Sequence, residues 1–353
     1  MNQPNCSTSG QSIQSLSSSN HPVEKSINDL LVSCKCLSLK LANFHRQICE
    51  ILDQTAISFV EIPPSSQFLT EELSKFAKFT SHRCTVLAIA FEDVANLHEC
   101  PSSTSKLVDS LAEIIEKMES FCESGCQLDI ARANGLLWTK DWLDCCLGMC
   151  DGLASFLNAL KSDDRRANLR TAGSLWETCD RAVELPNSNS AVFKQKCSEA
   201  ESLVNDAITE LANDTDLVKE QYGSVLKHIL ALCKCAKGCL RRLLSSHGLS
   251  LTDFCSTAQA NSQLDQISIL IGKLSPTVDE LATNFYDFEE IYDPESLELV
   301  KTDSRNLAEI VTEILELYQT SLWYSTEQDD AKLFDIVKKA VEHNVEKLNT
   351  VGV

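Results

Sequence analysis

Apolar residues recur at every third or fourth position along most of this chain, which is the spacing of one buried helix face. The first such run extends from Pro22 to Phe59 and stops at Pro63-Pro64. Its steps alternate between three and four residues, a narrow stripe typical of a helix that packs nearly parallel to its neighbours in a bundle. We therefore predict one long helix over this stretch.

The same periodicity predicts further helices down the chain. Thr70 offers a capping hydroxyl and Glu71-Glu72 an acidic first turn, which together indicate the start of a helix that ends near His98. Further helices are predicted over residues 102–123, 128–160, 167–186 and 189–212, and around Leu230.

Cap signatures mark where the later helices begin. Thr252-Asp253, Ser275-Pro276 and Asp293-Pro294 each predict a helix start, and the last two place Pro where the first helical turn tolerates it. Clear apolar stripes then run from Leu307 to Leu317 and from Phe334 to Leu348, and both are typical of helices that face a core.

These elements predict an all-α protein of roughly eleven helices in two up-and-down bundles resembling five-helix bundles. The sequence contains no alternating strand pattern, no Gly-rich phosphate loop and no repeat of constant length. We expect a disordered tail at 1–22, which is rich in Ser and poor in large apolar groups, an N-terminal bundle at 23–213 and a C-terminal bundle at 214–353. The break at 213–216 lacks Gly and Pro, so the pattern leaves open whether the flanking helices are continuous.

Composition and charge narrow the functional classes. The chain has 353 residues, of which 43% are hydrophobic, and no run of roughly 18 to 20 consecutive apolar residues is present, so we expect neither a membrane span nor a secretory leader. With 51 acidic and 31 basic residues the net charge is -20, which disfavours direct binding of nucleic acid. The 17 Cys fall on or beside apolar helical positions, which indicates reduced thiols packed in a core, as in an intracellular protein.

Candidate chemistry is sparse. Cys233, Cys235 and Cys239 lie near His228, but they point to different helix faces and no Cys-x-x-Cys pair completes a zinc site. Cysteines and histidines close in sequence, such as His82 and Cys84, occur by chance in a chain this rich in Cys. We expect no catalytic residues, no metal, no cofactor and no enzymatic activity.

The segment at 229–244, with the turn before it, combines two stripes on one helix. One is apolar and consists of Val225, Ile229, Leu232, Ala236, Leu240 and Leu243. The other, the basic stripe, consists of Lys227, Lys234, Lys237, Arg241 and Arg242 and is the candidate partner-binding surface. Two interpretations remain open: a solvated helix face balanced by acidic neighbours, or a surface that steers an acidic partner.

Three segments carry a resemblance to a known family. They are Ser174-Leu175-Trp176 through Leu185-Pro186, the run from Leu230 to Arg242, and the run from Leu274 to Ala282 that contains Ser275-Pro276. Together with the helix order, they resemble the cyclin-D-binding protein family, also described as maternal Id-like proteins with a helix-loop-helix that lacks its basic region. The chain departs from the family pattern before the Leu230 helix, where a long acidic insert is reduced to Asn213 through Asp216.

The resemblance implies an all-helical regulator of cell-cycle progression and transcription in the cytoplasm and nucleus. Such a protein would bind D-type cyclins and restrain cyclin-dependent kinase signalling and phosphorylation of the retinoblastoma protein, and some members also bind helix-loop-helix transcription factors. We expect the C-terminal bundle to present the cyclin-binding surface. The alternative is a vinculin- or talin-like scaffold or cytoskeletal adaptor, because long helical bundles also bind partners through helix grooves.

Overall fold

The fold was analysed in a computed structural model. It describes residues 22–52, 65–90, 102–161, 164–213, 220–245, 257–291, 294–324 and 328–351. This part of the chain forms eleven α-helices and no strand. The helices are α1 (Pro22–Leu52), α2 (Ser66–Ala90), α3 (Ser102–Gly125), α4 (Leu128–Asn134), α5 (Leu136–Leu160), α6 (Arg165–Val183), α7 (Asn189–Asn213), α8 (Glu220–Ser245), α9 (Ala258–Ile291), α10 (Pro294–Gln319) and α11 (Gln328–Thr350).

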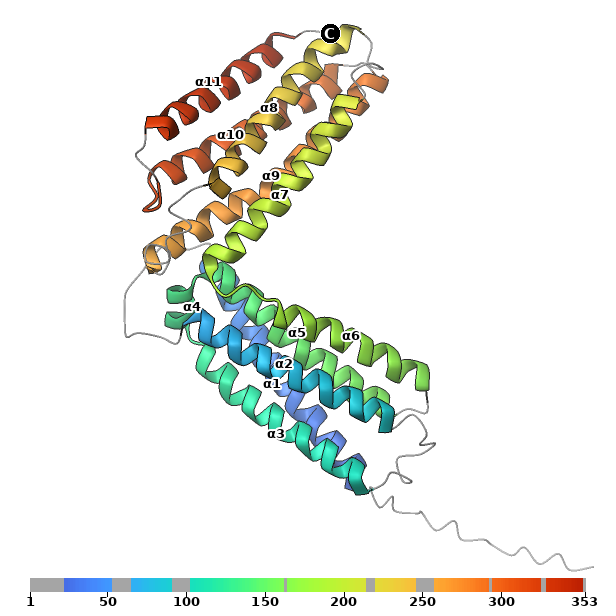
Figure 1. The fold of residues 1–353 in the computed structure, drawn as a ribbon. Helices are drawn as coiled ribbons and strands as arrows, with labels where there is room; N and C mark the ends of the chain where they lie inside the picture. The colour runs from blue at the N-terminus through green and yellow to red at the C-terminus, as the bar shows by residue number, and fades with distance from the viewer. Residues whose placement is uncertain are drawn as a thin grey trace, which may run out of the picture.

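The helices form two bundles that meet at one end with their long axes in different directions (Figure 1). In the first bundle α1 packs against α3 and α5, and α6 packs against α2 and α5. In the second, α7 and α10 pack against α9, while α8 lies between α7 and α11. The all-α prediction is confirmed.

The second bundle contains α7, which the sequence analysis assigned to the first. Its buried side chains, among them Phe193, Cys197 and Val204, lie where the helix packs against α8 and α9. Periodicity identifies the buried face of a helix but not the neighbour that covers it, so the expected boundary at 213 is wrong. The packing instead changes between residues 184 and 188, just before α7 begins.

Pairs of side chains show how α7 and α8 run. Glu201 on α7 pairs with Arg241 on α8, and Asn205 pairs with Lys237, so residue numbers rise on one helix as they fall on the other. The two helices are therefore antiparallel neighbours rather than one continuous helix. The segment between them, 214–219, lies outside the described residues, as do residues 1–21 of the expected tail and the predicted caps at Thr252-Asp253.

The core of the first bundle is built around α5. Trp138, Trp142 and Phe156 are each at most 1% exposed, and α5 contacts α1, α2, α4 and α6 as well as α7 and α9 of the second bundle. By length and composition alone α5 could cross a membrane, and it is the one described helix with that property. Its position at the centre of the bundle explains why it is so apolar.

A break at Gly135 corrects the prediction of one helix over 128–160. Gly135 has φ of 94°, a backbone conformation that strongly favours glycine, and it separates α4 from α5. A Cβ at this position would overlap the side chain of Asn189, the first residue of α7. The chain turns here because α7 and α9 supply hydrogen-bonding partners for both new helix ends.

Three buried polar side chains from the second bundle form hydrogen bonds with the backbone groups at the end of α4 and the start of α5. Asp265 on α9 accepts the backbone N–H groups of Leu136 at 2.9 Å and Leu137 at 3.0 Å. The Asn189 Oδ1 accepts the N–H of Trp138 at 2.8 Å, and its Nδ2 donates to Asp265 at 3.0 Å. These bonds cap three donors that the first turn of a helix would otherwise leave unpaired.

A carbonyl group at the end of α4 also receives its hydrogen bond from α9. The amide Nδ2 of Asn261, one turn before Asp265 on α9, donates to the backbone oxygen of Ala133 at 2.7 Å. In addition, the indole Nε1 of Trp138 donates to the oxygen of Pro186 at 2.8 Å. The two bundles are thus joined by a buried polar network as well as by apolar contacts.

Two further predictions of helix starts are corrected. Pro276 lies inside the 34-residue helix α9 rather than at the start of a new one. Pro276 has no backbone N–H, so the carbonyl of Gly272, one turn earlier, lacks its usual helical donor. Both residues are exposed, so water can bind that carbonyl. Leu274 and Val278 stay buried on the opposite face of the helix. α2 begins at Ser66, and Thr70 is a buried residue within it. The start at Pro294 is confirmed.

Candidate functional site: the basic stripe of α8

The inner face of α8 is the apolar stripe that the sequence predicted. The helix packs against α7, α9, α10 and α11, and this stripe is its buried side. Its members, which are each 0–1% exposed, are Val225, Ile229, Leu232, Ala236, Leu240 and Leu243. Burial of this face fixes the rotation of α8 and so decides which of its other side chains reach solvent.

The solvent-facing side of α8 alternates cations with small residues. Lys227, Lys234 and Arg241 are exposed and lie seven residues apart, so they fall on one line along the helix. Ala231 and Gly238 lie between them, and a Cβ added at Gly238 would meet no atom within 4 Å. A partner can therefore approach the backbone of α8 between its positive charges.

Two members of the basic stripe turn toward α7. The Arg241 Nε lies 2.9 Å from the Glu201 Oε1, and the Lys237 Nζ donates to the Asn205 Oδ1 and lies 4.0 Å from the Glu201 Oε1. Lys237 and Glu201 are both about one-fifth exposed, with side-chain values of 19% and 22%. For these two cations the structure supports the first interpretation, a helix face whose charge is balanced by an acidic neighbour.

The remaining members differ in environment. Arg242 is half-buried, and its Nη1 donates to the Ser245 Oγ at 3.5 Å on the same helix. Lys227 and Lys234 are exposed and have no ion-pair partner within the described ranges. These two lysines are therefore the part of the basic stripe whose charge is most available to a partner.

The other flank of α8 is joined to α11 through a contact that the sequence analysis missed. The His228 Nδ1 and the Asn344 Oδ1 are 2.8 Å apart, and the Asn344 Nδ2 donates to the oxygen of Ala340. Because an amide oxygen can only accept, the proton in the contact with Asn344 lies on the His228 Nδ1. The polar Asn344 interrupting the apolar stripe of α11 was the signal in the sequence.

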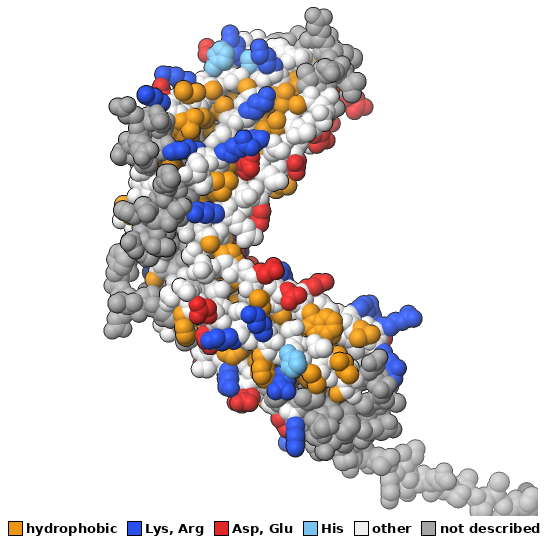
Figure 2. Space-filling view, in the orientation of Figure 1, with side chains coloured by type: hydrophobic (Ala, Val, Ile, Leu, Met, Phe, Trp, Pro, Cys, Tyr) orange, Lys and Arg blue, Asp and Glu red, His pale blue; other side chains and the backbone are white. Residues whose placement is uncertain are grey.

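Charge is unevenly distributed over the second bundle. Figure 2 shows Lys and Arg side chains over the face formed by α8 and α11, whereas Asp and Glu side chains follow the edge formed by α7. The basic stripe thus contributes to a positive face on a chain whose net charge is -20. Such a local field can orient an acidic partner during encounter.

The cysteines of α8 are suited to packing. Burial raises the pKa of Cys233 and of Cys239 from 9.0 to about 12, and it also raises the pKa of Cys235. The thiolate is the nucleophile and the metal ligand, so a raised pKa disfavours both roles. In the part of the chain that the structure describes, no three His, Cys, Asp or Glu side chains gather to hold a metal ion.

Comparisons with known proteins extend over both bundles. Residues 72–217 match the family model described as "Grap2 and cyclin-D-interacting, N-terminal". A protein named cyclin-D1-binding protein 1 homolog from Xenopus laevis is 23% identical over 313 residues, which cover 80% of this chain and 88% of the relative. The homolog from Danio rerio is 22% identical over 320 residues, covering 80% and 85% of the two chains.

A third relative, cyclin-D1-binding protein 1 from Bos taurus, is 22% identical over 305 residues, covering 76% of this chain and 80% of the relative. Alignments of this length exceed either bundle and therefore include helices from both. The resemblance carried by the three sequence segments is confirmed. The chain is therefore similar to the Grap2 and cyclin-D-interacting proteins, by the family model over residues 72–217 and by relatives that align with helices of both bundles.

Proposed function

We propose that this protein binds a D-type cyclin and regulates it by occupying the cyclin surface, without catalysing a reaction. The observation that carries the proposal is the alignment with three cyclin-D1-binding proteins over 76–80% of the chain. A mode of action by binding alone is in keeping with α8, whose thiols are protonated and whose exposed polar groups are cations and small residues.

The contact that we propose is the solvent-facing side of α8 around Lys227 and Lys234. Both side chains are exposed and free of ion pairs within the described residues, so binding would not break an existing contact. Cations at the rim of an interface speed association with an acidic partner and add a salt-dependent part of the affinity. Lys237 and Arg241 would act indirectly by holding α8 against α7.

Calorimetric titration of the full chain with a D-type cyclin, at two salt concentrations, tests the proposal. We expect saturable binding that weakens at the higher salt, and an affinity about tenfold lower, or ~1.4 kcal/mol, for the variant Lys227→Glu with Lys234→Glu. The matched control is Lys78→Glu with Lys273→Glu, which makes the same change in net charge at two other exposed positions. Absence of binding by the folded chain would refute the function, and equal weakening by both variants would refute the contact.

The regulatory consequence is restraint of cyclin-dependent kinase signalling in the cytoplasm and nucleus. These compartments keep thiols reduced, which suits the free, largely buried cysteines of the described chain. Adding the protein to an active cyclin D–kinase complex should slow phosphorylation of the retinoblastoma protein in proportion to cyclin occupancy. A complex that forms without slowing the kinase would limit the function to cyclin binding. Helix-loop-helix transcription factors are the second partner class, and the same titration applies to them.

A further inference from the structure

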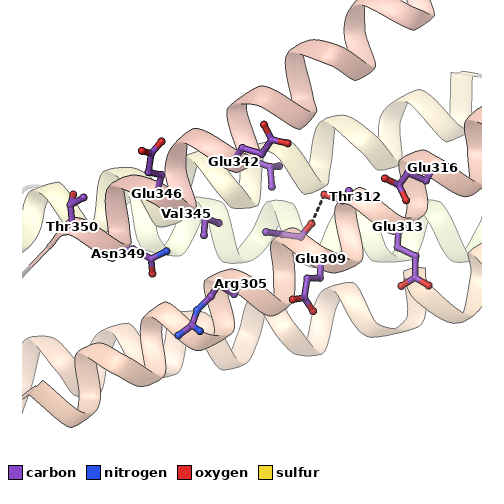
Figure 3. Close-up of a pocket in the computed structure, with 12 residues that line it drawn as sticks. Arg305, Glu309, Thr312, Glu313, Glu316, Glu342, Val345, Glu346, Asn349 and Thr350 are labelled. Carbon is purple, nitrogen blue, oxygen red and sulfur yellow. Dashed lines mark hydrogen bonds between the residues drawn. The ribbon is translucent and has the colours of Figure 1, made fainter.

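A groove of about 760 Å³ lies between α10 and α11, on a side of the second bundle not used in the proposal above (Figure 3). Its apolar lining includes Ala308 on α10 and Val341 and Val345 on α11. Thr312 also lines it, but its hydroxyl already donates to the oxygen of Ala308 at 2.8 Å. The floor is therefore apolar, and the hydroxyls of Thr312 and of Thr350, which also lines the groove, both donate to backbone oxygens of their own helices.

Glutamates border this floor along both helices. Three are on α10 and two are on α11, and all five are exposed: Glu309, Glu313, Glu316, Glu342 and Glu346. Within the described ranges, Glu316 is the one member of this set with an ion-pair partner, Lys338 at 3.2 Å. The lining includes one cation, Arg305, whose Nε donates to a backbone oxygen of its own helix. The groove thus combines an apolar floor with a rim on which glutamates outnumber cations.

The dimensions suit a short helix. The lining spans residues 305–316 of α10, which corresponds to a length of roughly 16 Å, or about three helical turns. α10 and α11 run antiparallel, because Arg305 and Asn349 line one end of the groove while Glu316 pairs with Lys338 toward the other, and each helix presents one side to the groove. An amphipathic helix laid between them would place apolar residues spaced three and four apart on the floor.

We propose that this groove binds an amphipathic helix of another protein, about three turns long, whose apolar face is flanked by Lys or Arg. The floor would bury the apolar face, and the glutamates of the two rims would pair with cations on either side of it. Charge complementarity decides between this occupant and an acidic or neutral helix, because a carboxylate brought to this rim would meet like charges at short range.

The segments that connect the described helices lack the cations that such a helix would carry. The segments 1–21, 53–64, 91–101 and 246–256 contain no Lys or Arg, and the shorter connecting segments contain one, Lys219. The basic stripe of a second copy has the right charge, but the apolar side of that helix is buried in its own bundle. The occupant is therefore a helix that arrives with both its apolar and its basic side exposed.

Fluorescence anisotropy with the full-length protein tests this inference. The probe is a labelled synthetic peptide of about 14 residues, with Leu at helical spacing and Lys on both flanks. A companion peptide has Glu in place of each Lys. We expect saturable binding of the basic peptide and no measurable binding of the acidic one. Failure of the basic peptide to bind the folded protein would overturn the proposal.

Variants locate the site. Glu309→Lys with Glu346→Lys should weaken binding of the basic peptide at least about tenfold, whereas Glu280→Lys with Glu290→Lys, exposed on α9, should leave it nearly unchanged. Val345→Trp should also weaken it by filling the floor, with the net charge unchanged and the helical circular dichroism retained. Equal effects of both charge variants would mean non-specific attraction and would overturn the proposal. So would self-association of the protein, seen by light scattering and abolished by Val345→Trp.

Discussion

The carboxylate of Asp265 lies 2.9 Å from the backbone nitrogen of Leu136, so a side chain of α9 caps the first turn of α5 from 129 residues away in the sequence. The same carboxylate accepts from Leu137 and from the amide of Asn189, and Asp265 is only 5% exposed. Helix caps usually come from the residue just before the helix. Here Gly135 occupies that place and has no side chain, so the acceptor comes from the other bundle.

Replacing Asp265 should destabilise the protein. Asp265→Ala leaves two buried backbone donors without an acceptor and removes one of the two acceptors of the Asn189 amide, at a cost of roughly 2–4 kcal/mol in the free energy of unfolding. Urea titration followed by circular dichroism measures this change. Asp287→Ala, at an exposed position on the same helix, should cost less than about 0.5 kcal/mol. Equal midpoints for the two variants would contradict a capping role.

The contribution of Asp265 should depend on pH. Burial raises the pKa of Asp265 above its ordinary value, although its three donors oppose the shift. Between the pKa of an unfolded Asp, about 3.9, and the higher folded value, the folded state holds more protons than the unfolded state. The contribution of this group to stability therefore falls as pH rises through that window and is constant above it.

The comparison of wild type with Asp265→Asn isolates that contribution, because the Asn does not titrate. The free energy of unfolding of the wild type, minus that of the variant, should increase as pH is lowered from 7 toward about 4. Urea titrations at several pH values measure the difference. A slope of the opposite sign would mean that the three hydrogen-bond donors lower the pKa of Asp265 more than burial raises it.

Two glycines form a matched test of the bend between α4 and α5. Gly135→Ala places a Cβ against the Asn189 side chain at a φ of 94° and should destabilise the protein by roughly 2–4 kcal/mol. Gly173→Ala, within α6, meets nothing within 4 Å and should stabilise it by about 0.5–1 kcal/mol. Thermal unfolding of both variants provides the comparison. A neutral effect at Gly135 would show that the bend adapts without Asn189.

The thiols should differ widely in reactivity. Cys36 is exposed, whereas burial raises the pKa of Cys233 and of Cys239 to about 12. Since the thiolate is the nucleophile, iodoacetamide at pH 8 should modify Cys36 at least a hundredfold faster than either. Mass spectrometry resolved by residue measures the rates, and denaturant should bring them close together. Comparable rates in the folded protein would contradict the burial of α8.

Most helices followed from apolar spacing, but their partners did not. The inner face of α8 was predicted residue by residue because it depends only on helical geometry. The pairing of Arg241 with Glu201 depends on the register between α7 and α8, which spacing within one helix does not determine. The same reason explains the misplaced boundary: the buried face of α7 is equally apolar whichever bundle covers it.

The break at Gly135 and the continuity at Pro276 were mispredicted for opposite reasons. The Asn134-Gly135 pair was a local sign of a turn, but the partners that stabilise it, Asn189 and Asp265, are distant in sequence. Pro276 was a local sign of a helix start, and burial along the rest of α9 outweighed it. The number of helices agreed with the prediction only because the two errors cancel.

The polar contacts between α9 and α5 bear on where this chain can be divided. A fragment ending at residue 217, where the matched family model ends, would keep α7 but lose α9. The most apolar helix of such a fragment would start with two unpaired donors, and α7 would expose the side that α8 and α9 cover. The sequence unit by which the family is recognised is therefore smaller than the physical unit that folds.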